Sequence, residues 1–232
     1  MDDADWSPRS LDEARERIDA IDTAMLVLLH DRAQVVGHVG RLKRESGGAG
    51  AASAYRPARE VAMLRALHAR TRDPLAFATV QAVWREIVSG FTAAQVPLPV
   101  HTVASAAPLA RDTFGAQAVV TLFPSAAECL AAMRAMPGAV ALLPATDTDW
   151  HGVVDSGGTV VAAAPYAGNR IEAWCVAMAD PEPSGPAPGD DTTLALTGGG
   201  LLRHIPGFAA DASGDTVLGA YPVPLKTGFP PP

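Results

Sequence analysis

The sequence predicts a two-part α+β protein in which three helices come first and an α/β domain follows. Apolar residues before Pro99 recur at the three- and four-residue spacing of helices, whereas after Pro99 they form short β-branched runs typical of strands. The chain has 232 residues, enough for two small domains that each bury a core. We expect the helical domain over residues 9–96 and the α/β domain over residues 100–226.

The first helix is predicted from one long apolar stripe with strict 3,4 spacing. Ser10 and Glu13 form a capping box at its start, and the glycine-rich stretch at residues 47–50 ends it. A stripe of this length predicts one extended helix with a coiled-coil-like buried seam. The stripe consists of Leu11, Ala14, Ile18, Ile21, Met25, Leu28, Val35, Val39 and Leu42.

Two shorter helices should follow before the pattern changes. Pro57 suits the first turn of a helix over residues 57–72, and Asp73-Pro74 separates it from a third helix that ends near Gln95. In the second half, Ser125 caps a helix between two strand-like runs, which is the strand–helix–strand order of an α/β domain. Strands are expected at residues 100–104, 118–123, 139–143, 159–164 and 173–178.

Composition excludes several classes of function. The net charge of −7 argues against nucleic-acid binding, because no basic field covers the chain. Two cysteines and six histidines without a HExxH pair predict neither a disulfide framework nor a metal site. No segment is long and apolar enough to span a membrane, and the acidic N-terminus lacks the apolar core of a signal peptide. We therefore expect a cytoplasmic protein that does not bind membranes.

Arg32 occupies the seam position between Leu28 and Val35, where an apolar residue is expected. A guanidinium there is costly unless a protein carboxylate or an anionic ligand meets it. Lys43 lies on nearly the same face, roughly 16 Å further along, so the two cations can bracket a small dianion. Arg15 lies roughly 25 Å before Arg32 and can join such a site only from a second, antiparallel copy of the helix. A shared site therefore requires a homodimer with two equivalent sites.

Three further polar residues complete the predicted site. Gln95 continues the apolar stripe of the third helix, and Arg59-Glu60 stands at the start of the second. Together with Arg15, Arg32 and Lys43 they supply four cations, one carboxylate and one amide. Such a set binds carboxylates and stabilises developing negative charge by position alone. The chemistry that fits is a unimolecular rearrangement of a hydroxylated dicarboxylate without a cofactor or a metal.

The segments LDEARERIDAIDTAMLVLLHDRAQVVGHVGRLK and YRPARE, with a third helix ending at Gln95, resemble the all-α class of chorismate mutases. The resemblance covers residues 9–96. It implies an intertwined helical homodimer that converts chorismate to prephenate by a Claisen rearrangement in aromatic amino acid biosynthesis. By this resemblance Arg15 of the partner chain and Arg32 bind the two carboxylates. It further implies that Lys43 and Gln95 contact the ether oxygen, that Glu60 contacts the ring hydroxyl and that Arg59 supports the site. The implied catalytic residues are Arg32, Lys43, Glu60 and Gln95.

Two positions depart from the pattern of that family. Arg56 stands where many members have an aspartate, and Phe91 stands where many have a serine. These departures keep open a catalytically inactive regulator that binds chorismate, prephenate or an aromatic amino acid. An isochorismate pyruvate lyase on the same helical scaffold is a further alternative, because it would need the same cations.

The second half carries a weaker resemblance to the first lobe of prephenate dehydratases. It rests on the segments LARDTFG, FPSAAECLAAM and VALLP, and a mutase followed by a dehydratase is a known domain order. Ala145-Thr146-Asp147 replaces the Glu-Asn-Ser of that family, however, and its Thr-Arg-Phe triplet is absent. The resemblance therefore implies a degenerate domain that does not dehydrate prephenate and either binds a regulatory ligand or supports the dimer.

Overall fold

The fold was analysed in a computed structural model of the chain. It forms two compact units, Met1–Gly48 and Ala49–Pro232, and each is described by itself. The structure describes residues 7–45, 55–146, 148–187, 189–208 and 212–227, without the side chains of residues 43 and 44.

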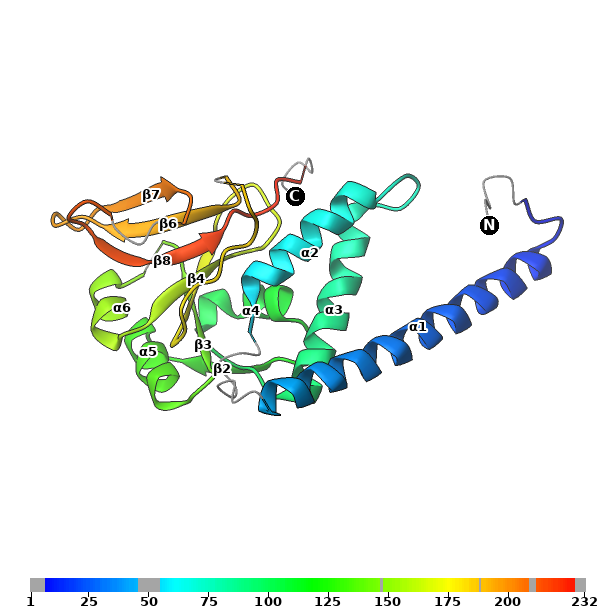
Figure 1. The fold of residues 1–232 in the computed structure, drawn as a ribbon, viewed down its shortest axis with the longest axis horizontal. Coiled ribbons are helices and arrows are strands. Elements are labelled where there is room, and N and C mark those ends of the chain that lie inside the picture. Colours follow the sequence, from blue (N-terminus) through cyan, green and yellow to red (C-terminus); the bar gives the residue numbers. More distant parts are fainter. Residues whose placement is uncertain (1–6, 46–54, 147, 188, 209–211, 228–232) are drawn as a thin grey trace. The chain divides into compact units, whose positions relative to one another are not determined.

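The first unit contains α1 (Leu11–Glu45), one uninterrupted helix as predicted (Figure 1). The capping box is present: the Glu13 backbone N–H donates to Ser10 Oγ at 3.1 Å, and Glu13 Oε2 accepts from the Arg9 backbone N–H at 2.8 Å. Apolar side chains of the predicted seam are exposed along α1, with Leu28 67% and Leu42 63% accessible. A helix with this stripe needs another surface to cover it.

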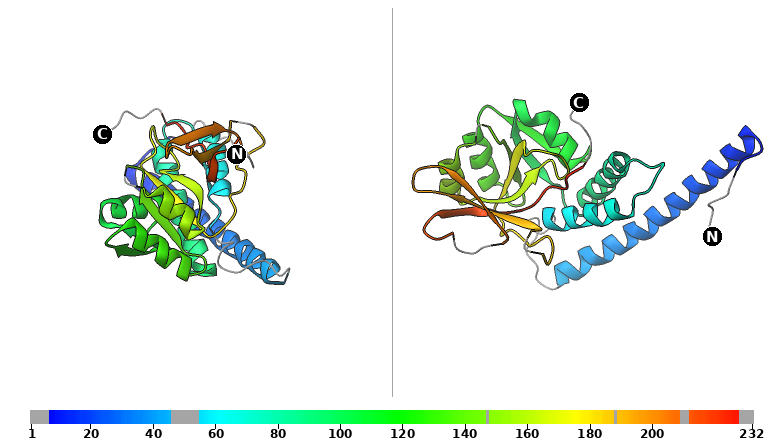
Figure 2. Two further views of the ribbon diagram at one scale, coloured as in Figure 1. Left: turned by 90° about the vertical axis from the view of Figure 1, so that its left-hand side faces the viewer. Right: turned by 90° about the horizontal axis from the view of Figure 1, so that it is seen from above.

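The second unit begins with α2 (Pro57–Arg70) and α3 (Phe77–Gln95), which confirm the other two predicted helices. The views in Figure 2 show them as neighbouring helices beside the sheet. Val61 and Leu64 of α2 and Phe77 of α3 belong to the same apolar core as Val100 and Val140 of the sheet. Helices α2 and α3 therefore pack on the α/β region through a continuous buried surface.

The α/β region is built on one eight-stranded mixed sheet with the strand order β2-β1-β3-β5-β4-β8-β6-β7. Strand β1 pairs in parallel with β2 on one side and β3 on the other, and antiparallel pairs β3–β5 and β4–β5 continue the sheet. The strands are β1 (Pro99–Val103), β2 (Val119–Phe123), β3 (Val140–Pro144), β4 (Thr159–Ala164), β5 (Ala173–Ala177), β6 (Asp191–Leu196), β7 (Leu202–Pro206) and β8 (Thr216–Pro222).

Helices cover both faces of this sheet. A 3-10 turn, η2 (Ala104–Ala106), leads into α4 (Ala107–Phe114), which shares the core of α2 and α3. On the other face, α5 (Ala126–Ala135) and α6 (Trp150–Ser156) cover a second core that includes Trp174 and Leu194. The predicted strands and α5 are confirmed to within two residues, whereas α4, α6 and β6–β8 were not predicted.

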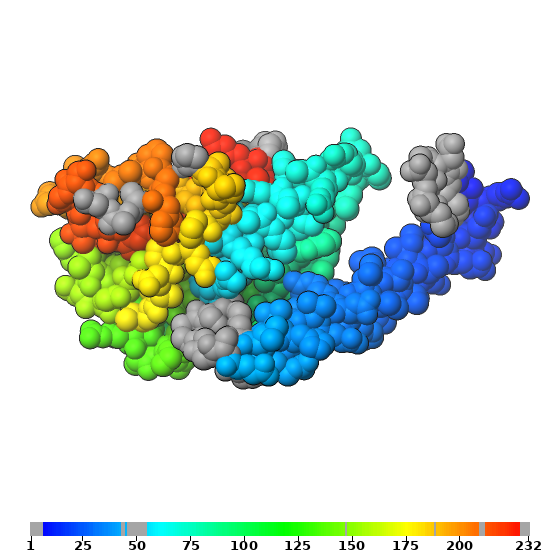
Figure 3. All heavy atoms as spheres, viewed as in Figure 1, coloured from blue at the N-terminus to red at the C-terminus, as the bar shows by residue number. Residues whose placement is uncertain are grey.

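Contacts between α2 and the loop after β5 tie the two regions together at the surface. Arg65 of α2 donates to Ser184 Oγ at 2.9 Å and to the backbone carbonyls of Asp190 and Val223 at 2.7 and 2.8 Å. This loop, yellow in Figure 3, lies beside the cyan α2. Two of these hydrogen bonds fix the loop on the helix, and the third holds Val223, which follows β8.

Three further findings concern membrane-spanning helices, metal-binding groups and cysteines in the part of the chain that the structure describes. No helix within it is long and apolar enough to cross a membrane. Within the same residues, no group of three or more His, Cys, Asp or Glu side chains could hold a metal ion. Cys129 and Cys175 are buried free thiols, and burial raises the pKa of Cys129 to about 11 and that of Cys175 to about 12.

Candidate functional site

The predicted site residues divide between the two units. Arg15 and Arg32 lie on α1; Arg15 is exposed and pairs with Asp12 at 3.2 Å. Lys43 is also on α1, but its side chain lies outside the described residues. Arg59, Glu60 and Gln95 belong to the second unit. Their assembly with the α1 cations into one site stays a prediction.

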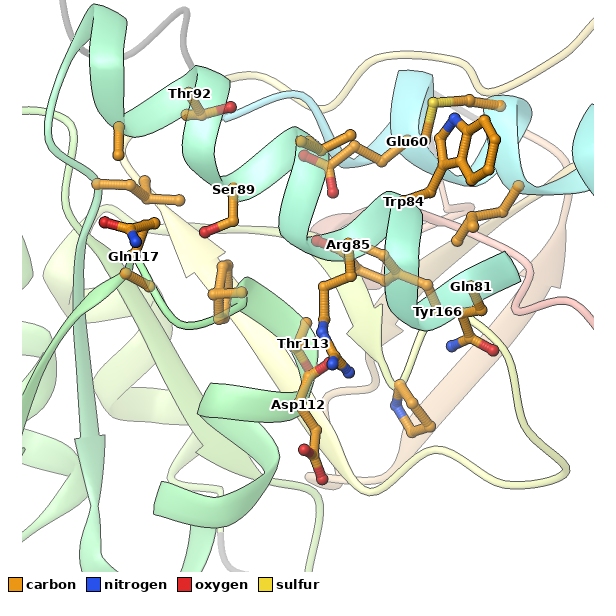
Figure 4. Close-up of a pocket in the computed structure, with 18 residues that line it drawn as sticks. Glu60, Gln81, Trp84, Arg85, Ser89, Thr92, Asp112, Thr113, Gln117 and Tyr166 are labelled. Carbon is orange, nitrogen blue, oxygen red and sulfur yellow. The ribbon is translucent and has the colours of Figure 1, made fainter. Parts of the chain in front are cut away.

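Within the second unit the three predicted residues have different surroundings. Arg59 is exposed in the first turn of α2. Gln95 is exposed at the end of α3, and its Nε2 donates to the backbone carbonyl of Phe91 at 3.2 Å. Glu60 alone of the three lines a pocket, which α2, α3, α4 and the segment after β4 surround (Figure 4).

This pocket, called the Glu60 pocket below, contains about 720 Å³ of empty space, part of it open to solvent. Apolar walls come from Leu64, Trp84 and Phe114, and polar groups come from α3, α4 and Tyr166. Figure 4 shows Glu60 directed between α2 and α3 toward Ser89. The lining therefore combines flat apolar walls with groups that can form hydrogen bonds.

Burial changes the acid–base behaviour of Glu60. Loss of solvent around its carboxyl group raises the pKa of Glu60 from the usual 4.5 to about 7. Both protonation states are thus accessible near neutral pH. Glu60 can accept a hydrogen bond from a ligand hydroxyl when ionised and donate one when protonated.

Hydrogen bonds and a close glycine contact fix α4 against α3. Arg85 Nη1 donates to the Asp112 backbone carbonyl at 3.0 Å, and the Ala116 backbone N–H donates to Glu86 Oε2 at 3.0 Å. Gly115 ends α4 with φ of 77°, and a Cβ there would lie 2.7 Å from Ser89 Cβ. Only glycine fits this conformation and this approach without strain. The local sequence RDTFG therefore sets how closely the end of α4 approaches α3, and both helices line the pocket.

Thr113, near the end of α4, is one of the polar residues that line the pocket. Its side chain is only 8% exposed, and its Oγ1 has no hydrogen-bond partner among the described residues. Leaving a buried hydroxyl unsatisfied costs about 1–3 kcal/mol. Thr113 lies in the LARDTFG segment noted in the sequence, where nothing in its spacing pointed to the pocket of Glu60.

Tyr166 reaches the same pocket from the segment that follows β4. It is 6% exposed, and its hydroxyl shares a hydrogen bond of 2.7 Å with the Tyr55 hydroxyl. Burial raises the pKa values of both phenols well above their usual range, and the Glu60 carboxylate raises that of Tyr166 further. Sequence patterns did not indicate Tyr166, because it follows an alanine-rich strand without a motif of its own.

The two departures from the family pattern have distinct local roles. Arg56, just before α2, donates from Nε and Nη2 to Glu182 Oε2 at 3.0 and 2.9 Å. It thus connects the start of α2 to the loop after β5. Phe91 is half-buried on α3, and its carbonyl accepts from Gln95.

A second, open cavity lies at the carboxyl ends of β1, β2 and β3. Three of its polar residues are already used locally. Ser125 Oγ accepts from the Glu128 backbone N–H at 3.3 Å, Asp149 Oδ1 accepts from that of Gly152 at 3.0 Å, and Thr148 Oγ1 donates to the Pro144 carbonyl at 2.6 Å. Asp147 lies outside the described residues. These side chains cap helices and close a turn.

Comparison with known proteins assigns the helical segment to a family. Residues 14–96 match the family chorismate mutase type II. A bifunctional chorismate mutase/prephenate dehydratase of Neisseria gonorrhoeae is 38% identical over 117 residues, which cover 50% of this chain and 29% of the relative. A protein of the same description from Pseudomonas aeruginosa is 37% identical over 87 residues, or 37% of this chain and 24% of the relative. The matches thus cover less than a third of either relative, and no solved structure matches the chain.

Proposed function

Because residues 14–96 of this chain are a chorismate mutase type II domain followed by an α/β region, we propose that it converts chorismate to prephenate in aromatic amino acid biosynthesis. The observation that carries the proposal is the coincidence of this match with the polar residues that helix packing does not explain. Arg15, Arg32, Lys43, Arg59, Glu60 and Gln95 all fall inside the matched segment. It is supported by Glu60, which is half-buried, lines a pocket and has a raised pKa.

The reaction is a unimolecular Claisen rearrangement, in which the ether C–O bond breaks, a C–C bond forms and no atom leaves. The enzyme therefore acts by binding a compact, chair-like substrate and stabilising charge that develops on the ether oxygen. Arg32 and the partner subunit's Arg15 hold the carboxylates in this proposal. Lys43 and Gln95 donate to the ether oxygen, so Gln95 Nε2 must leave the Phe91 carbonyl. Glu60 accepts from the ring hydroxyl, and Arg59 supports the site.

The proposed site requires two copies of the chain. Arg15 and Arg32 stand 17 residues apart on one helix, so a single copy cannot place both on one small ligand. The exposed apolar stripe of α1 supplies the surface for a second copy, and antiparallel pairing would generate two equivalent sites. We therefore propose a homodimer with shared active sites, located in the cytoplasm.

For the α/β region we propose a dehydratase-like domain that lacks dehydratase activity. Ser125, Thr148 and Asp149 at the carboxyl ends of the parallel strands are engaged in local hydrogen bonds. Ala145-Thr146-Asp147 also differs from the dehydratase motif. Purified protein supplied with prephenate should form no phenylpyruvate, and steady formation of phenylpyruvate would contradict this part of the proposal.

The mutase proposal is tested by the loss of chorismate ultraviolet absorbance, with the product identified by chromatography. We expect prephenate from the wild-type chain and no measurable turnover from Arg32→Ala. Arg17→Ala, which removes a cation from the same helix away from the proposed site, should retain activity. Release of pyruvate would instead indicate a lyase, and binding of chorismate without turnover would indicate a regulator. An Arg32→Ala variant as active as the wild type would contradict the proposed site.

A further inference from the structure

The hydroxyl of Thr113 lacks the kind of hydrogen bond that Thr23, Thr71 and Thr102 make. Helical threonines ordinarily bond the carbonyl one turn back, as Thr23 does with Asp19 and Thr71 with Leu67, both at 2.8 Å. In the sheet, the buried Thr102 Oγ1 donates to the Leu142 carbonyl at 2.8 Å. Thr113 Oγ1 has no such partner within the described residues, although more than nine-tenths of the side chain is buried.

Packing keeps this hydroxyl at the Glu60 pocket. The hydrogen bonds from Arg85 to Asp112 and from Ala116 to Glu86 bracket Thr113 on both sides along the chain. Gly115 brings the end of α4 against Ser89. These contacts hold the end of α4, and Thr113 with it, beside the pocket.

Thr113 and Glu60 line the same pocket from different elements. Glu60 comes from α2 and Thr113 from α4, and Figure 4 shows them on either side of Arg85. Trp84 and Phe114 add flat apolar surfaces. A ring that places one oxygen substituent near Glu60 can place another near Thr113, and this would satisfy the unpartnered hydroxyl.

We propose that Thr113 is a substrate-binding residue of the Glu60 pocket and that the α/β region thereby contributes directly to the mutase site. Its hydroxyl forms a hydrogen bond with an oxygen of the hydroxylated dicarboxylate whose ring hydroxyl Glu60 binds. This inference rests on the proposed function for the identity of the ligand. The observation behind it, an unpartnered buried hydroxyl on a residue that lines the pocket, does not depend on turnover.

The test compares Thr113→Val, which keeps the shape but removes the hydroxyl, with Thr113→Ser, which keeps the hydroxyl. Chorismate kinetics are measured together with calorimetric binding of prephenate, the product of the proposed reaction. Thr113→Val should raise KM for chorismate and Kd for prephenate about tenfold with a smaller change in kcat. Its thermal midpoint should stay equal or rise, because an unsatisfied polar group is removed. Thr113→Ser should stay within about twofold of the wild type.

The matched control is Thr102→Val, which removes a hydroxyl that already has a partner. It should lower the thermal midpoint and leave KM and Kd unchanged. If Thr113→Val does not fold, Thr113→Cys, with a weaker donor in a similar volume, takes its place in the same comparison.

The outcomes separate this inference from the proposed function. Wild-type turnover with unchanged KM and Kd in Thr113→Val would overturn the inference and leave the mutase proposal standing. Absence of wild-type turnover together with Thr113-dependent prephenate binding would refute the mutase proposal and support the role of Thr113. If the wild type does not bind prephenate, or if Thr113→Val and Thr113→Ser bind it equally well, the inference is overturned whatever the turnover.

Discussion

The hydroxyl oxygens of Tyr55 and Tyr166 lie 2.7 Å apart, although 111 residues separate the two in sequence. Tyr55 leads into α2, and Tyr166 follows β4 and lines the Glu60 pocket. This hydrogen bond joins the start of α2 to the α/β region, and Tyr166 lines the same pocket as Glu60. Breaking it should therefore affect stability first and the pocket second.

The Tyr55–Tyr166 bond can be measured with a double-mutant cycle. Tyr55→Phe and Tyr166→Phe each break this hydrogen bond, and each should lower the free energy of unfolding by about 1–3 kcal/mol. The double variant should lose less than the sum of the two, because both polar groups are then absent. Urea unfolding of the four proteins provides the measurement. Additive losses would show that the two hydroxyls do not interact.

Gly115 should tolerate no side chain. Gly115→Ala places a Cβ 2.7 Å from Ser89 Cβ at a φ of 77°, so it should lower the free energy of unfolding by more than about 1 kcal/mol. Gly90→Ala is the control, because its Cβ would meet nothing within 4 Å and alanine favours the interior of α3. Equal stability of Gly115→Ala and the wild type would mean that α4 does not approach α3 in this way.

Glu60 should give stability a dependence on pH that is opposite to that of an ordinary paired carboxylate. Its folded pKa of about 7 lies above the usual 4.5, so the folded chain holds this proton more tightly than the unfolded chain. Stability relative to Glu60→Gln should be highest below pH 4.5, fall as pH rises to 7 and level off above it, by up to about 3 kcal/mol. Thermal midpoints of both proteins from pH 4 to 8.5 provide the measurement. A constant difference across this range would contradict the shift.

The same carboxyl group should set a pH dependence of activity. If ionised Glu60 accepts from the ring hydroxyl, kcat/KM should rise as pH increases through about 7. Tyr166 in the same pocket stays protonated over this range, since burial and the Glu60 carboxylate raise its pKa. Glu60→Gln should lose most activity together with this rise. A wild-type profile that is flat around neutral pH would argue against a role for ionised Glu60.

The exposed seam of α1 should control the oligomeric state. Leu28→Asp puts a charge into the apolar stripe and should convert a dimer to a monomer in sedimentation velocity, with loss of mutase activity. His30→Asp changes a residue about 200° further around the helix and should leave the dimer intact. A wild-type chain that sediments as a monomer at micromolar concentration would remove the proposed role of Arg15.

Sequence patterns predicted the long elements well because their signals are local. The 3,4 stripe and the Ser10–Glu13 capping box determine α1, and Ser125 caps α5 as expected. Strands β6–β8 were not predicted, because their pairing depends on strands that are distant in the sequence. Gly219, for example, pairs with both Val160 and Leu194. Helix α4 was not predicted although Pro108 in its first turn and Gly115 at its end are boundary signals, because eight residues carry too short an apolar pattern.

The site shows the same division between local and tertiary signals. Glu60 was singled out by its place beside Arg59 in a recognisable segment; it lines a pocket, and its role in a mutase site stays a prediction. Thr113 and Tyr166 were not predictable, because their relation to Glu60 arises from the packing of α4 and β4 on the helices. No spacing rule connects residues that only tertiary structure brings to one cavity.

The central claim is that chorismate rearranges at sites shared by two copies of the chain, and a mixing experiment tests it most directly. Arg15→Ala and Arg32→Ala homodimers should each be inactive, because every site lacks one carboxylate ligand. Subunit exchange between them should recover about one quarter of the wild-type activity, since half of the dimers are mixed and each mixed dimer has one intact site. Differently tagged chains and native mass spectrometry establish that mixed dimers form. Mixed dimers with no more activity than either parent would contradict the claim.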